Sequence, residues 1–141
     1  MANDSTGVID VISSHSAGES LDRLEALVRA RGLLVFARID FAADAARAGL
    51  ALRPMLALLF GNPRAGTPLL ASQPRAGLDL PLRALAWEDE DGVVRLSYVA
   101  PEWIAARHGL PVELAGNLAA IRALVEDAAT GGSLAEPASV H

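Results

Sequence analysis

The chain has 141 residues, with 12 basic and 17 acidic side chains, a net charge of −5, and neither cysteine nor lysine. Without these two residue types it cannot form a disulfide, a cysteine zinc site, a Schiff base or the lysine contact of a P-loop. The pI of about 5.1 and the aromatic content of 4% argue against nucleic-acid binding, which usually needs a basic face and stacking rings.

The two ends of the chain are poor in groups that could anchor them. Residues 1–6 are small and polar, and residues 131–141 are rich in Gly, Ser and Ala, so both are predicted to be disordered tails. No repeat or composition break divides residues 7–130, which are predicted to form one domain. The start lacks the features of a signal peptide, and the longest apolar run, Met55 to Phe60, is far below the roughly 20 residues of a membrane helix. We therefore expect a cytoplasmic protein that does not bind membranes.

The first half of the chain alternates between strand and helix signals. Ser16 and Glu19 form a capping box, which predicts a helix start, and Gly32 predicts its end. Asp40 can cap a further short helix. In chain order we expect a strand over 8–12, a helix over 16–31, a strand over 33–39, a short helix from Asp40 to Ala48 and a buried strand over 55–60.

The second half begins with a helix signal and continues with a hairpin. Thr67 is the predicted N-cap of a short helix with Pro68 at its first position, interrupted by Pro74 and Gly77. The turn ending Asp91-Gly92 predicts a hairpin. We expect strands over 82–88 and 93–99, a helix over 101–109, and a last helix over about 113–129 that buries Leu114, Leu118, Ile121 and Val125.

The resulting order is β-α-β-β-β-β-α, with short helical insertions. Such an order predicts an α+β fold in which the helices gather on one face of a sheet. The hairpin makes the sheet largely antiparallel.

Several strings in this sequence carry a family resemblance. They occupy residues 34–40, 52–54, 60–69, 78–82 and 87–89, and the most specific is Gly61-Asn62-Pro63-Arg64-Ala65-Gly66-Thr67-Pro68. Together they resemble the bacterial family called domain of unknown function 302, over about residues 8–128. The resemblance implies a compact α+β fold and a reaction that has not been assigned. Members of that family often carry His directly after the Ile-Asp pair, where this chain has Phe41.

The stretch from Gly61 to Leu70 is the first candidate site. Its glycine spacing is that of a P-loop, but the lysine and the hydroxyl residue that follow in a P-loop are missing, which argues against nucleotide hydrolysis. A glycine-bearing turn at a helix start still offers N–H groups to an anion, and Arg64 could add charge. The residue pattern favours a purely structural role for this stretch, in which Asn62-Pro63 shapes a turn and Thr67 caps a helix.

Arg38, Asp40, Arg53 and Asp79 form the second candidate site. Each lies at the polar end of an apolar element, so these side chains are expected to emerge together at a rim of the sheet. Arg and Asp there could grip a carboxylate or phosphate, or could make structural ion pairs, which is the more common role.

The sequence contains no motif that indicates a metal or cofactor site. His15, His108 and His141 do not form a set, and zinc-protease and serine-hydrolase motifs are absent. We predict no metal and no cofactor, and we assign no catalytic residue.

Three functional hypotheses remain from these observations. The first is a homodimeric protein that binds a small ligand, with an anion as one option, at the Gly61–Thr67 loop. The second is a hydrolase or isomerase that uses Asp40 or Asp79 as general base. The third is a dimeric interaction module without a pocket. The homodimer is predicted because a mean hydropathy of +0.31 is high for a monomer.

Overall fold

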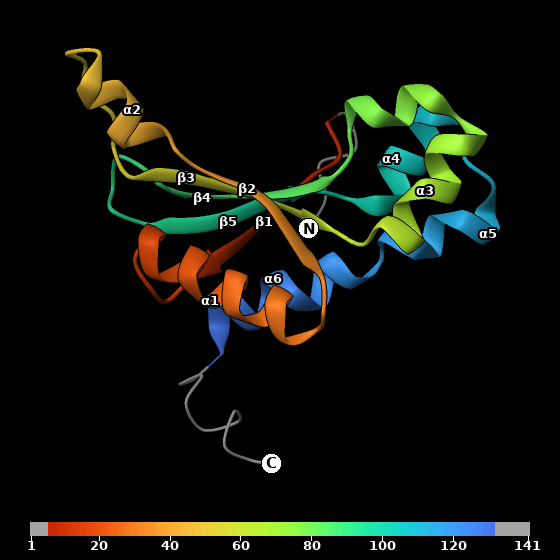
Figure 1. Ribbon diagram of the computed structural model, residues 1–141. Helices are drawn as coiled ribbons and strands as arrows, with labels where there is room; N and C mark the ends of the chain where they lie inside the picture. The colour runs from red at the N-terminus through yellow and green to blue at the C-terminus, as the bar shows by residue number, and fades with distance from the viewer. Residues whose placement is uncertain (1–5, 132–141) are drawn as a thin grey trace.

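A five-stranded antiparallel sheet forms the centre of the computed structural model, which describes residues 6–131 (Figure 1). Of the predicted tails at residues 1–6 and 131–141, residues 1–5 and 132–141 lie outside the described residues. The strand order across the sheet is β1-β5-β4-β3-β2. The strands are β1 (Val8–Ser13), β2 (Leu34–Asp40), β3 (Met55–Gly61), β4 (Leu82–Glu88) and β5 (Val94–Val99). The predicted α+β fold with an antiparallel sheet is therefore confirmed.

Two helices cover one face of the sheet and the short helical elements lie at its two ends (Figure 1). The covering helices are α1 (Ala17–Ala30) and α6 (Ala120–Thr130), which also pack against each other. The short α2 (Phe41–Arg47) extends from one end. The opposite end holds α3 (Pro63–Ser72), η1 (Pro74–Leu78), α4 (Pro101–His108), α5 (Val112–Ala115) and η2 (Gly116–Leu118).

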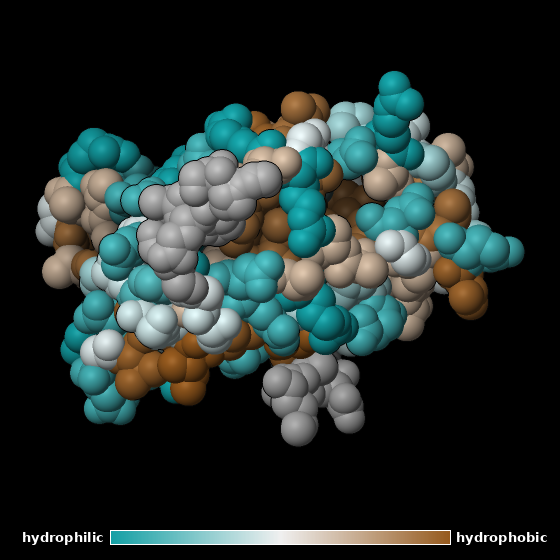
Figure 2. All heavy atoms as spheres, turned by 90° about the horizontal axis from the view of Figure 1, so that it is seen from below, coloured by the Kyte–Doolittle hydropathy of each residue, from teal (hydrophilic) through white to brown (hydrophobic). Residues whose placement is uncertain are grey.

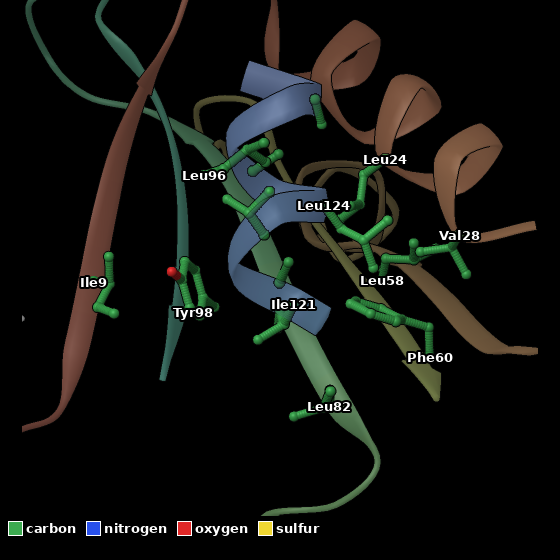
Figure 3. Packing of buried hydrophobic residues seen from close by; sticks show 14 of the residues in the cluster. Ile9, Leu24, Val28, Leu58, Phe60, Leu82, Leu96, Tyr98, Ile121 and Leu124 are labelled. Atoms are coloured by element: carbon green, nitrogen blue, oxygen red, sulfur yellow. The ribbon is translucent and has the colours of Figure 1, made fainter. Parts of the chain in front are cut away.

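The hydrophobic core lies between the sheet and the α1–α6 pair (Figure 3). Alternate residues of each strand point to this face, as the two-residue period of a strand requires. In β3, for example, Leu58 and Phe60 are fully buried there. The helices contribute Leu21, Leu24, Val28, Ile121, Leu124 and Val125.

The predicted caps of the first two helices are confirmed. The Glu19 N–H donates to Ser16 Oγ at 3.1 Å at the start of α1, and Gly32 follows its end with a positive φ of 75°. At the start of α2 the Ala43 N–H donates to Asp40 Oδ1 at 2.9 Å. Each cap satisfies a backbone N–H that has no partner inside its helix.

The predicted start of the third helix is wrong. Asn62 is the N-cap, because its Oδ1 accepts the Arg64 N–H at 3.0 Å, and Pro63 takes the first helical position. Thr67 and Pro68 lie inside α3. Both Asn62-Pro63 and Thr67-Pro68 place a capping side chain before a proline, and the chain uses the earlier pair.

The prediction that the last helix is continuous is also wrong. Instead of one helix over about 113–129, the chain forms α5, η2 and α6 in succession. The break falls at Gly116 and Asn117, where glycine costs about 1 kcal/mol of helix propensity relative to alanine. The predicted buried stripe survives the break: Leu118, Ile121 and Val125 are buried and Leu114 is partly buried.

The C-terminal end of α6 is held by groups from the beginning of the chain. Arg23 of α1 donates from Nε to the Ala128 carbonyl at 2.9 Å and from Nη2 to the Asp127 carbonyl at 3.2 Å. The Ser14 N–H donates to the Ala129 carbonyl at 3.0 Å. The last carbonyls of a helix lack partners within it, so these contacts tie α6 to α1 and β1.

Candidate functional site

A cavity of about 260 Å³ opens beside the start of α3. We call it the α3 cavity. Figure 2 looks onto the helix-covered face and shows an apolar hollow toward the end of the molecule where α3 and α5 lie. The cavity is lined by Leu33, Phe36, Phe60, Gly61, Asn62, Pro63, Ala65, Gly66, Thr67, Leu70, Leu80, Pro81, Leu82, Asn117, Leu118 and Ala120.

The helix start at this cavity has no free N–H groups for an anion. Pro63 has no N–H, and the Arg64 N–H donates to Asn62 Oδ1. The next two N–H groups, of Ala65 and Gly66, donate to the Asn62 carbonyl at 2.9 and 2.8 Å. An anion cradle needs such groups to point at the ligand, and here they are used within the chain.

Three residues with polar side chains line the α3 cavity: Asn62, Thr67 and Asn117. Asn117 Nδ2 donates to the Ala65 carbonyl at 2.9 Å, which joins η2 to the first turn of α3. Arg64 is exposed and does not line the cavity. The structure thus places Asn62 and Thr67 of the predicted loop at the cavity, together with Asn117, which the sequence did not indicate because its contact with Ala65 spans 52 residues.

The second predicted constellation is distributed over different parts of the molecule. Arg38 of β2 pairs with Asp22 at 2.8 Å and Glu25 at 2.9 Å on α1. Asp40 uses its carboxylate to cap α2, and Arg53 is exposed in the segment between α2 and β3, without an ion pair in the described part of the chain.

Asp79, like Arg38, contacts two side chains of the opposite type. Its Oδ2 accepts from His108 Nε2 at 2.5 Å and lies 3.0 Å from Arg107 Nη1. The His108 side chain is 6% exposed. Arg107 also lies over the Trp103 ring, 5.6 Å from its centroid. The contact between His108 and Asp79 was not predicted from the sequence, because 29 residues separate the two.

Burial and ion pairing shift the pKa values of four side chains, those of Glu25, Arg38, Asp89 and Tyr98. Hydrogen bonds from Arg38 and then from Arg29 hold the pKa of Glu25 below its usual range. Burial raises the pKa of the Tyr98 hydroxyl, and Tyr98 does not line the α3 cavity. Among residues 6–131, no cluster of three His, Asp or Glu residues could hold a metal ion.

A family model described as domain of unknown function DUF302 matches residues 9–128. The chain belongs to this family. The resemblance noted from the sequence, over residues 8–128, is therefore confirmed. Phe41, which follows the Ile39-Asp40 pair, forms the first residue of α2 and is partly buried.

A solved structure has the same fold. The uncharacterized conserved protein DUF302 from Bacillus stearothermophilus superposes with a TM-score of 0.71 over 87% of this chain and 95% of that one. The two sequences are 19% identical, so the likeness shows the fold alone.

Two curated relatives are much closer in sequence but longer. Proteins named fluoride-specific ion channel FluC 1 from Brucella suis biovar 1 (strain 1330) and Brucella abortus biovar 1 (strain 9-941) are each 42% identical over 125 residues, or 89% of this chain. The match covers 48% and 45% of those relatives, so this chain spans about half of their length. The match alone does not assign the channel activity to the shared half.

Within residues 6–131, none of the helices has the length and apolar character needed to cross a bilayer. The cytoplasmic location and the homodimer stay predictions.

Proposed function

We propose that this domain binds a small, mainly apolar molecule in the α3 cavity, with the polar end of the molecule toward Asn62, Thr67 and Asn117. The composition of the wall carries the proposal, because 13 of its 16 residues lack a polar side chain and three have one. An apolar wall with a few convergent polar groups is typical of small-molecule sites.

The size of the α3 cavity limits the ligand. Its volume of about 260 Å³ lies just below the roughly 300–1,000 Å³ of typical ligand pockets. It exceeds the roughly 150 Å³ of an apolar cavity that admits benzene. A molecule of one ring with a short polar substituent therefore matches the space.

A neutral ligand is favoured over an anion at this site. The N–H groups at the start of α3 are bonded within the chain, and no guanidinium lines the cavity. An anion placed here would lose its hydration without gaining a cation or a free N–H in return. A hydroxyl or carbonyl group needs one or two hydrogen bonds, which the two amide side chains and the Thr67 hydroxyl can supply.

Filling the cavity from within tests this proposal. Gly66 lines the cavity inside α3, and a Cβ atom built on it meets nothing within 4 Å. The variant Gly66→Leu should fill the space, and its free energy of unfolding should stay equal or rise by about 0.5–1 kcal/mol, because leucine is the better helix former. Gly18→Leu is the matched control: Gly18 is also a helical glycine with free space around its Cβ, and it lies on α1, outside the cavity.

Benzyl alcohol and benzoate are suitable probes, followed by amide ¹H–¹⁵N NMR. We expect saturable shifts at Thr67, Leu70 and Asn117 with benzyl alcohol, at least tenfold weaker binding of benzoate, and loss of binding in Gly66→Leu but not in Gly18→Leu. Unchanged binding of benzyl alcohol by Gly66→Leu would refute the cavity as the site. Tighter binding of benzoate would refute the preference for a neutral ligand.

A further inference from the structure

The two central strands of the sheet separate toward one end. Between β4 and β5 the register pairs run only from Leu85–Ser97 to Glu88–Val94. Beyond them Leu82 pairs with β3 alone and Val99 pairs with β1 alone. Figure 3 shows the strands that carry Tyr98 and Leu82 diverging, with Ile121 of α6 between them. The sheet therefore forks, and the inner edges of the fork lack a cross-strand partner.

A cavity of about 280 Å³ occupies this fork. We call it the fork cavity. Its apolar wall comes from five residues of five different elements: Leu78, Leu82, Val99, Ile104 and Ile121. Asp79 and Arg83 give the wall its charged side chains. The fork cavity thus combines an apolar interior with a charged rim, which differs from the nearly uncharged wall of the α3 cavity.

Of the two charged side chains at this rim, one has ion-pair partners and the other has none within residues 6–131. The Asp79 carboxylate is already paired with Arg107 and His108. Arg83 is exposed on β4 and has no ion pair within the part of the chain that the structure describes. The Asp79 carboxylate is thus already paired with groups from outside the wall, whereas the Arg83 guanidinium is not paired within residues 6–131. An unpaired guanidinium beside an apolar wall selects an anionic group attached to an apolar body.

We propose that the fork cavity binds a small monocarboxylate with a short apolar chain. The carboxylate accepts from Arg83, and the chain lies against Leu82, Val99 and Ile104. Asp79 is a positioning residue: its bonds to Arg107 and His108 hold α4 against the rim and offset its own negative charge beside the bound carboxylate. This site is separate from the α3 cavity, although Leu82 contributes to both walls.

Hexanoate and hexan-1-ol form a matched pair of probes, because they share the chain and differ in the charged head. Titrations followed by amide ¹H–¹⁵N NMR should show saturable shifts with hexanoate at Asp79, Arg83, Val99 and Ile104. Hexan-1-ol should bind at least tenfold more weakly there. The variant Arg83→Gln should weaken hexanoate at least tenfold, since a charge-assisted hydrogen bond is lost.

Arg31→Gln is the control variant, because Arg31 is an exposed arginine outside both cavities and carries the same charge change. It should leave hexanoate binding within twofold of the wild type. The amide spectra themselves show whether each variant is folded. Equal binding of hexanoate and hexan-1-ol, or equal binding of hexanoate by the wild type and Arg83→Gln, would overturn the proposal. Shifts confined to Thr67, Leu70 and Asn117 would also overturn it and would leave the proposed α3 site standing.

Discussion

Arg23 offers a direct measure of how strongly α6 is tied to the rest of the domain. Its side chain is 8% exposed, and its guanidinium donates to the carbonyls of Asp127 and Ala128 in the last turn of α6. The variant Arg23→Met keeps most of the aliphatic volume and removes both donors. The Asp127 carbonyl retains the Gly131 N–H at 2.9 Å, so the principal loss is at Ala128.

The expected cost follows from these contacts. Losing a hydrogen bond from a charged donor to a buried acceptor costs about 1.5–3 kcal/mol. Losing a cation at a helix C-terminus adds about 0.3–1 kcal/mol. The thioether chain recovers part of this by burying apolar surface, so we expect Arg23→Met to lower the free energy of unfolding by about 2–3 kcal/mol. Arg23→Lys keeps the charge and one donor, so its free energy of unfolding should lie between those of the wild type and Arg23→Met.

Urea denaturation followed by circular dichroism measures this difference, provided that unfolding is two-state and the slope is unchanged. Arg29→Met is the control on the same helix: Arg29 is 60% exposed and pairs with Glu25 at 2.9 Å, so its loss should cost about 0.3–0.5 kcal/mol. If Arg23→Met and Arg29→Met cost the same, the guanidinium does not hold α6, and the apolar stripe of the helix is sufficient by itself.

Two further substitutions test the electrostatic description. Tyr98→Phe should leave the free energy of unfolding unchanged or raise it by up to about 1 kcal/mol, because the buried Tyr98 hydroxyl has no partner among the described residues; a loss above 1 kcal/mol in thermal or urea unfolding would reveal a partner. Glu25→Gln should lower stability at pH 7 by less than about 1 kcal/mol, because the ion group lies at the surface. The lowered pKa of Glu25 stabilises the folded state above the ordinary value of 4.5, and this contribution is lost as the pH falls through the lower folded value. The wild type and Glu25→Gln should therefore converge in urea denaturation at acid pH, and a difference that persists there would contradict the assignment.

The sequence predicts those elements of the fold whose signals are local. The N-cap at Ser16, the cap at Asp40 and the hairpin turn at Asp91-Gly92 each depend on residues within four positions of one another, and each prediction is confirmed. The strands follow from apolar runs that only a sheet can bury. The order of the strands across the sheet depends on contacts between distant residues, so it comes from the structure.

The sequence predicts the candidate sites less well, for two physical reasons. At α3 two start signals of the same kind lie five residues apart, and the helix begins at Asn62, which is the better N-cap residue, rather than at Thr67. At the rim of the sheet the side chains of Arg38 and Asp79 occur at the ends of similar elements but find partners on different helices, α1 and α4. Those partners lie 16 and 29 residues away, beyond the range in which periodicity or capping carries information.

The distribution of carboxylates favours binding over hydrolysis at both cavities. Lysine and cysteine are absent, so a general base or nucleophile at either cavity would have to come from another side chain, a carboxylate above all. Asp79 is the one carboxylate that lines either cavity within residues 6–131, and both of its oxygens accept from Arg107 while one also contacts His108. The carboxylate of Asp40, the other predicted general base, accepts the Ala43 N–H at the start of α2. Both candidate general bases are thus engaged by neighbouring groups, which supports the proposed binding role of these cavities.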